Sequence, residues 1–82
     1  MTAWEPITVS ARWNMDGHVV VRQFRRKGGA ATLMVESTGR QWEEEDGLHV
    51  LCMVSGLGVF ELRFQLQPAG WLLRQPRHAQ AA

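Results

Sequence analysis

The chain of 82 residues lacks the devices that usually stabilise very small secreted domains. Its one cysteine, Cys52, has no second cysteine with which to form an internal disulfide and no cysteine partner for a metal site. A chain of this length hides only about 60–65% of the surface that its unfolded form exposes, which leaves room for one core and not for two. The sequence therefore predicts a single small domain that is stabilised by packing.

Long apolar runs and an excess of charge are also absent. No segment reaches the roughly 18 apolar residues that a membrane-spanning helix needs, and residues 1–6 show no cationic run followed by an apolar stretch. Nine Lys and Arg face eight Asp and Glu, and the net charge of +1 gives no general attraction to polyanions. We therefore expect a cytoplasmic protein without membrane contact, in which any affinity for nucleic acid depends on a local cluster.

The strongest pattern in the chain is an alternation of apolar and polar residues with a period of two. It is clearest in residues 59–67, where the apolar positions are Phe60, Leu62, Phe64 and Leu66. In a strand, this spacing puts the apolar side chains on one face and the polar side chains on the other. The pattern is typical of a sheet with one packed face and one solvent-exposed face.

Six strands are predicted, over residues 7–13, 18–26, 31–37, 48–55, 59–67 and 71–75. The segment 31–37 also suits a helix, but Thr32 and Val35 favour a strand, which is the prediction adopted. Residues 39–47 are polar and are interpreted as a connection that holds Trp42 and an acidic run. Short strands about ten residues apart, joined by Gly-rich turns, indicate an all-β antiparallel meander of about six strands, rolled or closed into a small barrel.

Two local signals refine this prediction. Asp16-Gly17 is the strongest hairpin signal in the chain and separates the first two predicted strands. In the second strand Phe24 falls out of phase with the apolar residues before it, so either a bulge or a switch of face at the end of the strand is expected near Arg22. The domain core is predicted over residues 5–75, and residues 76–82 show no pattern and are predicted to be a disordered tail.

Few residues suit catalysis. His18, His49 and His78 lie at a hairpin end, at a strand start and in the tail, and nothing in the sequence brings them together. Cys52 lies in the middle of an apolar strand, where a free cysteine is usually a small buried hydrophobic residue. We therefore expect no enzyme, and an enzyme that depends on Cys52 and His49 ranks third among the hypotheses.

No metal site or cofactor is expected either. The three histidines and Cys52 lack the paired spacing that is typical of zinc ligands. The acidic run 43–46 lies on an extended segment, where consecutive side chains point in alternating directions and rarely converge on one cation. Gly56 and Gly58 lack the third glycine and the following helix of a nucleotide-binding loop.

Basic residues gather on the second predicted strand and next to it. They are Arg12, Arg22, Arg25, Arg26 and Lys27, and Phe24 lies among them. Basic side chains beside an exposed aromatic residue are a common way of holding single-stranded nucleic acid on a small barrel, through phosphate neutralisation and base stacking. A nucleic-acid-binding module that uses these six residues is the second hypothesis.

The first hypothesis is a protein interface. The strand 48–55 is apolar on both faces, with Leu51 and Met53 on the face opposite to its other apolar residues. A small sheet without a helix has nothing to cover that second face. The chain also holds four tryptophans, a residue enriched at binding hot spots, and Trp42 lies in the polar connection. We therefore expect a homodimer or a protein partner that contacts Leu51, Met53 and Trp42.

Five short motifs in order along the chain resemble a small bacterial β-rich domain family of unknown function. They are Glu5-Pro6-Ile7-x-Val9, Gln23-Phe24-Arg25-Arg26-Lys27-Gly28, Trp42, Val59-Phe60-Glu61-Leu62 and Gly70-Trp71-Leu72-Leu73. The resemblance implies association with proteins similar to translesion DNA polymerases, no catalytic residue, and an accessory role in DNA repair. Members of that family tend to carry an aromatic residue within the basic turn, where this chain has Arg26, so only Phe24 is left to stack on a base.

Overall fold

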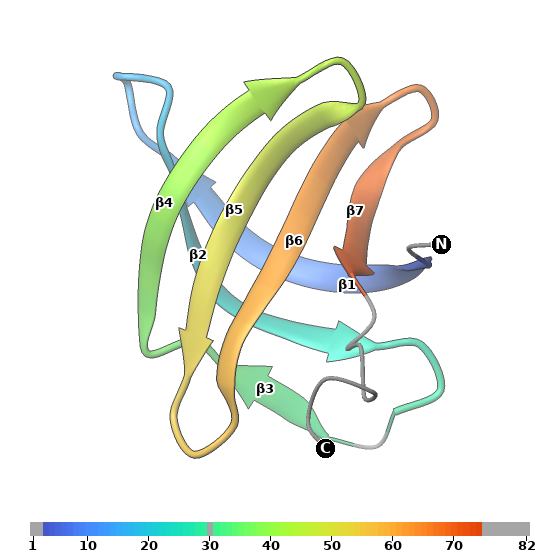
Figure 1. The fold of residues 1–82 in the computed structure, drawn as a ribbon. Helices are drawn as coiled ribbons and strands as arrows, with labels where there is room; N and C mark the ends of the chain where they lie inside the picture. Colours follow the sequence, from blue (N-terminus) through green and yellow to red (C-terminus); the bar gives the residue numbers. More distant parts are fainter. Residues whose placement is uncertain (1–2, 30, 75–82) are drawn as a thin grey trace.

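The computed structural model describes residues 3–29 and 31–74, and all regular structure in this part of the chain is β-strand. The strands are β1 (Trp4–Trp13), β2 (Val19–Arg26), β3 (Thr32–Met34), β4 (Ser37–Glu44), β5 (Gly47–Val54), β6 (Gly58–Leu66) and β7 (Ala69–Arg74). They form one antiparallel sheet in the order β3-β2-β1-β7-β6-β5-β4, which curls into a half-barrel (Figure 1). The predicted all-β meander that rolls towards a barrel is confirmed. Among the described residues there is no helix that could span a membrane.

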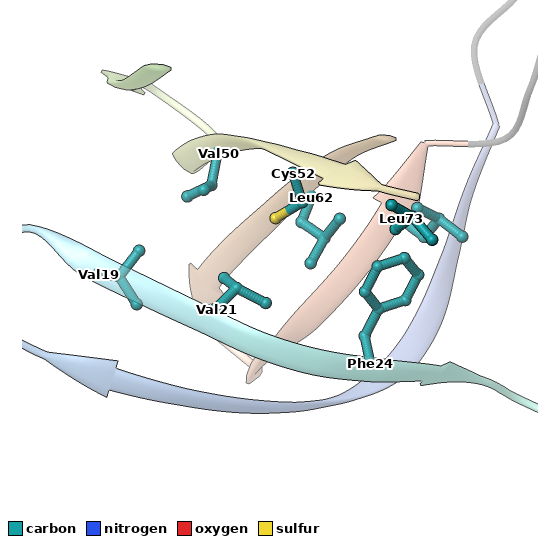
Figure 2. Packing of buried hydrophobic residues seen from close by; sticks show 8 residues of the cluster. Val19, Val21, Phe24, Val50, Cys52, Leu62 and Leu73 are labelled. Atoms are coloured by element: carbon teal, nitrogen blue, oxygen red, sulfur yellow. The ribbon is translucent and has the colours of Figure 1, made fainter. Parts of the chain in front are cut away.

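The inner face of the curled sheet carries the hydrophobic core (Figure 2). Its members are each at most 5% exposed and are Val19, Val21, Phe24, Val50, Cys52, Val54, Leu62 and Leu73. They come from β2, β5, β6 and β7, and the predicted alternation in β5 and β6 supplies the inward side chains of those two strands. Curling places β2 opposite β5 and β6, so that a single sheet encloses its own apolar face.

A bulge in β2 explains how residues of different parity share this core. Val21 and Gln23 pair with consecutive residues of β1, so Arg22 is the extra residue between them. The extra residue shifts the alternation by one position, and Phe24 then faces inward like Val19 and Val21. The predicted bulge near Arg22 is confirmed.

The predicted hairpin between the first two strands is confirmed as well. Gly17 has a φ of 92°, and its N–H donates to the carbonyl oxygen of Asn14 at 3.0 Å. The N–H of His18 donates to Asp16 Oδ1, also at 3.0 Å. Gly17 thus adopts the positive φ that the turn requires, and the Asp16 carboxylate accepts a backbone hydrogen bond within the turn.

The interpretation of residues 39–47 as a connection is wrong. Most of that segment belongs to β4, which pairs with β5 and leaves only Glu45 and Asp46 as the turn between them. Because β4 adds a strand to the six that were predicted, the described residues form a sheet of seven strands. The predicted strand at 31–37 is shorter than expected, since β3 spans Thr32–Met34. Residues 75–82, which include the end of the last predicted strand and the predicted tail, lie outside the described residues.

Side chains of β4 close the half-barrel against β2, which is not its neighbour in the sheet. Gln41 and Thr38 point inward and bond to the backbone of Val19 and Val21 respectively. The half of the β2 edge that has no neighbouring strand therefore forms its backbone hydrogen bonds with side chains of β4. The other half pairs with β3. This arrangement leaves β2 without an open edge along most of its length.

Candidate functional site

The structure places the proposed base-stacking residue in the core. Phe24 is 1% exposed, and its ring packs edge-on against Phe60, with the ring centroids 5.6 Å apart. The prediction that Phe24 stacks on a nucleic-acid base is therefore wrong. The physical reason is the bulge at Arg22, which turns this side chain to the inner face.

The predicted basic residues remain at the surface, with one exception. Arg12, Arg22, Arg25 and Lys27 are exposed, and Arg12 and Arg25 lie on the outer face of β1 and β2. Arg26 is partly buried and donates from Nη2 to Glu5 Oε1 at 2.6 Å. The result is a basic surface in which none of the predicted residues supplies an exposed aromatic ring.

Cys52 and His49 lie on opposite faces of β5 and do not meet. Cys52 points into the core, where burial raises the pKa of its thiol to about 12. The side chain is therefore protonated at neutral pH and is a poor nucleophile. His49 points to the outer face, where it takes part in a separate group of contacts.

The predicted protein-interface residues lie in two separate places, Leu51 and Met53 on β5 and Trp42 on β4. Met53, 39% exposed, lies on the outer face of β5 and pairs with Val59 of β6, which is 58% exposed. Leu57 in the connecting turn is 60% exposed, and Leu51 of β5 is partly buried. We call these four residues the hairpin surface. Trp42, in contrast, lies on β4 and stacks on His49.

His49 is buried on the outer face, at 4% exposure, and is bonded through both ring nitrogens. Nε2 lies 2.7 Å from Asp46 Oδ1, and Nδ1 lies 2.8 Å from Glu61 Oε2. Ionised carboxylates only accept hydrogen bonds, so the arrangement suits an imidazolium that donates from both nitrogens. Burial alone would lower the pKa of His49, but the hydrogen bonds to Asp46 and Glu61 outweigh it and the pKa is raised.

Two arginines extend this group into an alternating series of charges. Arg63 Nη1 donates to Asp46 Oδ2 at 2.7 Å, and Arg74 Nη1 donates to Glu61 Oε1 at 2.8 Å. Three cationic groups and two carboxylates therefore alternate across β5, β6, β7 and the β4–β5 turn. We call these five residues the His49 network.

Two tryptophans cover the His49 network. The Trp42 ring stacks on His49 with centroids 5.3 Å apart, and Trp4 meets the same imidazole edge-on at 5.7 Å. The guanidinium carbon of Arg63 lies 4.5 Å from the Trp4 ring centroid. Sequence reasoning missed the network because its five members come from four separate segments of the chain. The only available signal was their outward parity on β5 and β6.

Glu44, Asp46 and His49 offer ligand atoms that lie within 4.8 Å of one another. Each of these groups already has a hydrogen-bond partner within the chain. Trp42 Nε1 donates to Glu44 Oε2 at 2.6 Å, and Asp46 and His49 are bonded to each other. The geometry therefore fits the cationic imidazole and indole N–H better than it fits a metal ion.

An open groove of about 1130 Å³ lies at the end of the half-barrel that is formed by the β1–β2, β4–β5 and β6–β7 turns. Its apolar lining includes Trp13, Leu48, Phe64 and Leu66, and its acidic lining consists of Asp16 and residues 43–46. We call it the end groove. It shares Trp42 and Asp46 with the surroundings of His49, which therefore form one of its walls.

The hairpin surface adjoins the β5–β6 turn, and the end groove adjoins the β4–β5 turn. These two turns lie at opposite ends of β5 (Figure 1). No protein-family model, no curated protein and no solved structure matches the chain.

Proposed function

We propose that this protein is a non-enzymatic interaction module that associates with a second copy of itself through the hairpin surface. The observation that carries the proposal is the exposure of Met53, Leu57 and Val59, at 39–60%, on one hairpin. Met53 and Val59 are direct cross-strand neighbours, so their side chains form a continuous apolar area. Burial of such an area against a matching copy contributes about 25 cal/mol for each Å² removed from water, and this gain opposes the entropic cost of association.

The surroundings of the candidate catalytic groups support the non-enzymatic part of the proposal. The thiol of Cys52 is buried in an apolar core, and both nitrogens of His49 are held by carboxylates. A general base needs a free nitrogen within reach of a substrate proton, and a thiol nucleophile needs a thiolate. Neither group meets that requirement in this conformation.

Light scattering at high micromolar concentration tests the proposal. We expect a dimer for the wild type and a monomer for Met53→Glu, because the new carboxylate would be buried in the contact. Met15→Glu is the matched control, since Met15 is fully exposed in the β1–β2 turn at the other end of the molecule. A monomeric wild type, or a Met53→Glu variant that dimerises like the control, would refute the proposal.

Nucleic-acid binding is the second candidate, and the exposed arginines of β1 and β2 favour it. Without Phe24, this candidate depends on phosphate contacts alone, and such contacts weaken steeply with added salt. An anisotropy titration of labelled single-stranded DNA at low salt separates the two: salt-sensitive binding supports this candidate, and a flat titration removes it. The resemblance described above extends the first proposal to a role beside a translesion-polymerase-like protein.

A further inference from the structure

We infer that the end groove is a second binding site and that its ligand is a peptide segment bearing arginine. The site is separate from the hairpin surface and does not depend on self-association. Three features of the groove carry the inference: uncompensated carboxylates on the rim, a half-exposed indole inside, and walls that are held in place without a ligand.

The rim has more negative charge than residues 3–29 and 31–74 neutralise. Glu43 and Glu45 are exposed and form no ion pair with any residue in the described part of the chain. Asp46 is paired with Arg63 and His49. Asp16 is paired with His18, and both of these side chains are exposed to solvent. The groove therefore attracts a cationic ligand through at least two free carboxylates.

The indole of Trp13 supplies the second element of recognition. It is 48% exposed in the groove, although Phe64 and Trp71 hold it at centroid distances of 5.6 and 6.4 Å. A large aromatic ring left half in water beside carboxylates is suited to a cation that can lie over its face. The two features therefore select the same kind of ligand.

The chain itself shows which cation fits. The guanidinium of Arg63 lies over Trp4 and bonds to Asp46, so one arginine already stacks on an indole while it pairs with a carboxylate. The guanidinium of Arg40 lies 5.4 Å from the Trp42 centroid. A planar guanidinium can stack and form a bidentate bond at the same time, whereas a lysine ammonium acts as a point charge. We therefore assign arginine and not lysine to the groove.

The dimensions of the groove favour a peptide over a free small cation. A volume of about 1130 Å³, bounded by three turns, accommodates several residues of an extended chain. Its walls are fixed in advance, because Asp46 bonds to Arg63 of β6 and ties the β4–β5 turn to the neighbouring strand. A preformed groove of this kind loses little entropy when a segment binds.

A peptide titration at low ionic strength tests the inference. The probe is a fluorescent pentapeptide with two arginines separated by glycine, and its controls contain citrulline or lysine in place of arginine. We expect saturable binding of the arginine peptide, weaker binding of the lysine peptide and none of the citrulline peptide. Equal binding of the arginine and citrulline peptides, or no binding of the arginine peptide, would overturn the inference.

Matched variants locate the binding. The double variant Glu43→Gln/Glu45→Gln should weaken the arginine peptide about three- to tenfold, as expected for two surface charges. Glu36→Gln, an exposed carboxylate outside the groove lining, should leave the affinity unchanged. Wild-type affinity in the double variant would place the ligand elsewhere and refute the assignment. Met53→Glu should bind the peptide like the wild type, so failure of self-association and failure of this inference are distinguishable.

Discussion

The side chain of Gln41 acts towards Val19 as a neighbouring strand would. Gln41 Oε1 accepts from the Val19 N–H at 3.0 Å, and Gln41 Nε2 donates to the Val19 carbonyl oxygen at 2.5 Å. Thr38 repeats the pattern with Val21, accepting its N–H at 3.0 Å and donating to its carbonyl at 3.3 Å. Two polar side chains thus supply the hydrogen bonds that buried backbone groups require, and they close the half-barrel.

Gln41→Ala should therefore lower the free energy of unfolding by about 2–4 kcal/mol, because it leaves two backbone groups of Val19 without partners. Thr38→Val preserves the shape of the side chain and should cost about 1–2 kcal/mol. Urea unfolding followed by tryptophan fluorescence measures both losses. Gln67→Ala is the control, since Gln67 is exposed and should change stability little. Equal midpoints for Gln41→Ala and this control would show that the closure does not depend on Gln41.

The same two residues explain why β4 could not be predicted. A strand is recognised when apolar residues occupy every second position, but the inward positions of β4 include Thr38 and Gln41. These two residues are polar because their side chains form the hydrogen bonds with β2 that a neighbouring strand would otherwise form. The alternation of apolar and polar residues is therefore lost in β4. In β6 the inward residues only fill the core, and the strand was predicted correctly.

The bulge depends on residues close together in the sequence, whereas the His49 network depends on residues far apart in it. The bulge at Arg22 was predictable because the break in parity between Val21 and Phe24 is visible within one strand. The contact of His49 with Glu61 depends on how β5 and β6 pair, and a single sequence does not fix that register. Fold class was therefore accessible from local pattern, while the buried polar site was not.

Stability should depend on pH through the His49 network. The pKa of His49 is raised above its ordinary 6.5, so its contribution is complete below pH 6.5 and is lost as pH rises through the folded-state pKa. The bond to His49 lowers the pKa of Asp46, and for Glu61 the bonds to His49 and Arg74 overcome the opposing effect of burial and lower its pKa from 4.5. The contributions of both carboxylates are lost at acid pH. Urea midpoints should therefore be highest between pH 4.5 and 6.5.

The variant His49→Gln tests whether His49 causes the loss of stability above pH 6.5. It removes the titrating imidazole, so the decline above pH 6.5 should flatten even though the variant is less stable throughout. His18→Gln is the matched control, because His18 is 66% exposed in its pair with Asp16 and should leave the decline in place. An unchanged decline in His49→Gln would assign the pH dependence to another group.

The thiol of Cys52 should react with an aromatic disulfide reagent only when the protein unfolds. The side chain is 0% exposed and its pKa is raised to about 12 by burial, so the thiolate is rare in the folded state. Labelling rates measured across a urea series should rise in step with the unfolded fraction. A fast reaction in buffer at pH 8 would show that the core opens locally and would reinstate Cys52 as a reactive residue.

Gly47 is the position at which the smallest added side chain should do the most damage. It has a φ of +135°, and a Cβ built there would lie 2.3 Å from the carbonyl oxygen of Phe64 on β6. Because backbone and not a flexible side chain occupies that space, Gly47→Ala must displace β5 from β6 at the rim of the end groove, at an expected cost of about 3 kcal/mol or more. Gly56→Ala separates conformation from crowding, since Gly56 has a φ of +82° and nothing within 4 Å of its added Cβ, and it should cost about 1 kcal/mol. Urea midpoints compare the two variants. Equal losses would mean that the close approach of Gly47 to Phe64 carries no energetic weight and that only the backbone conformation of each turn matters.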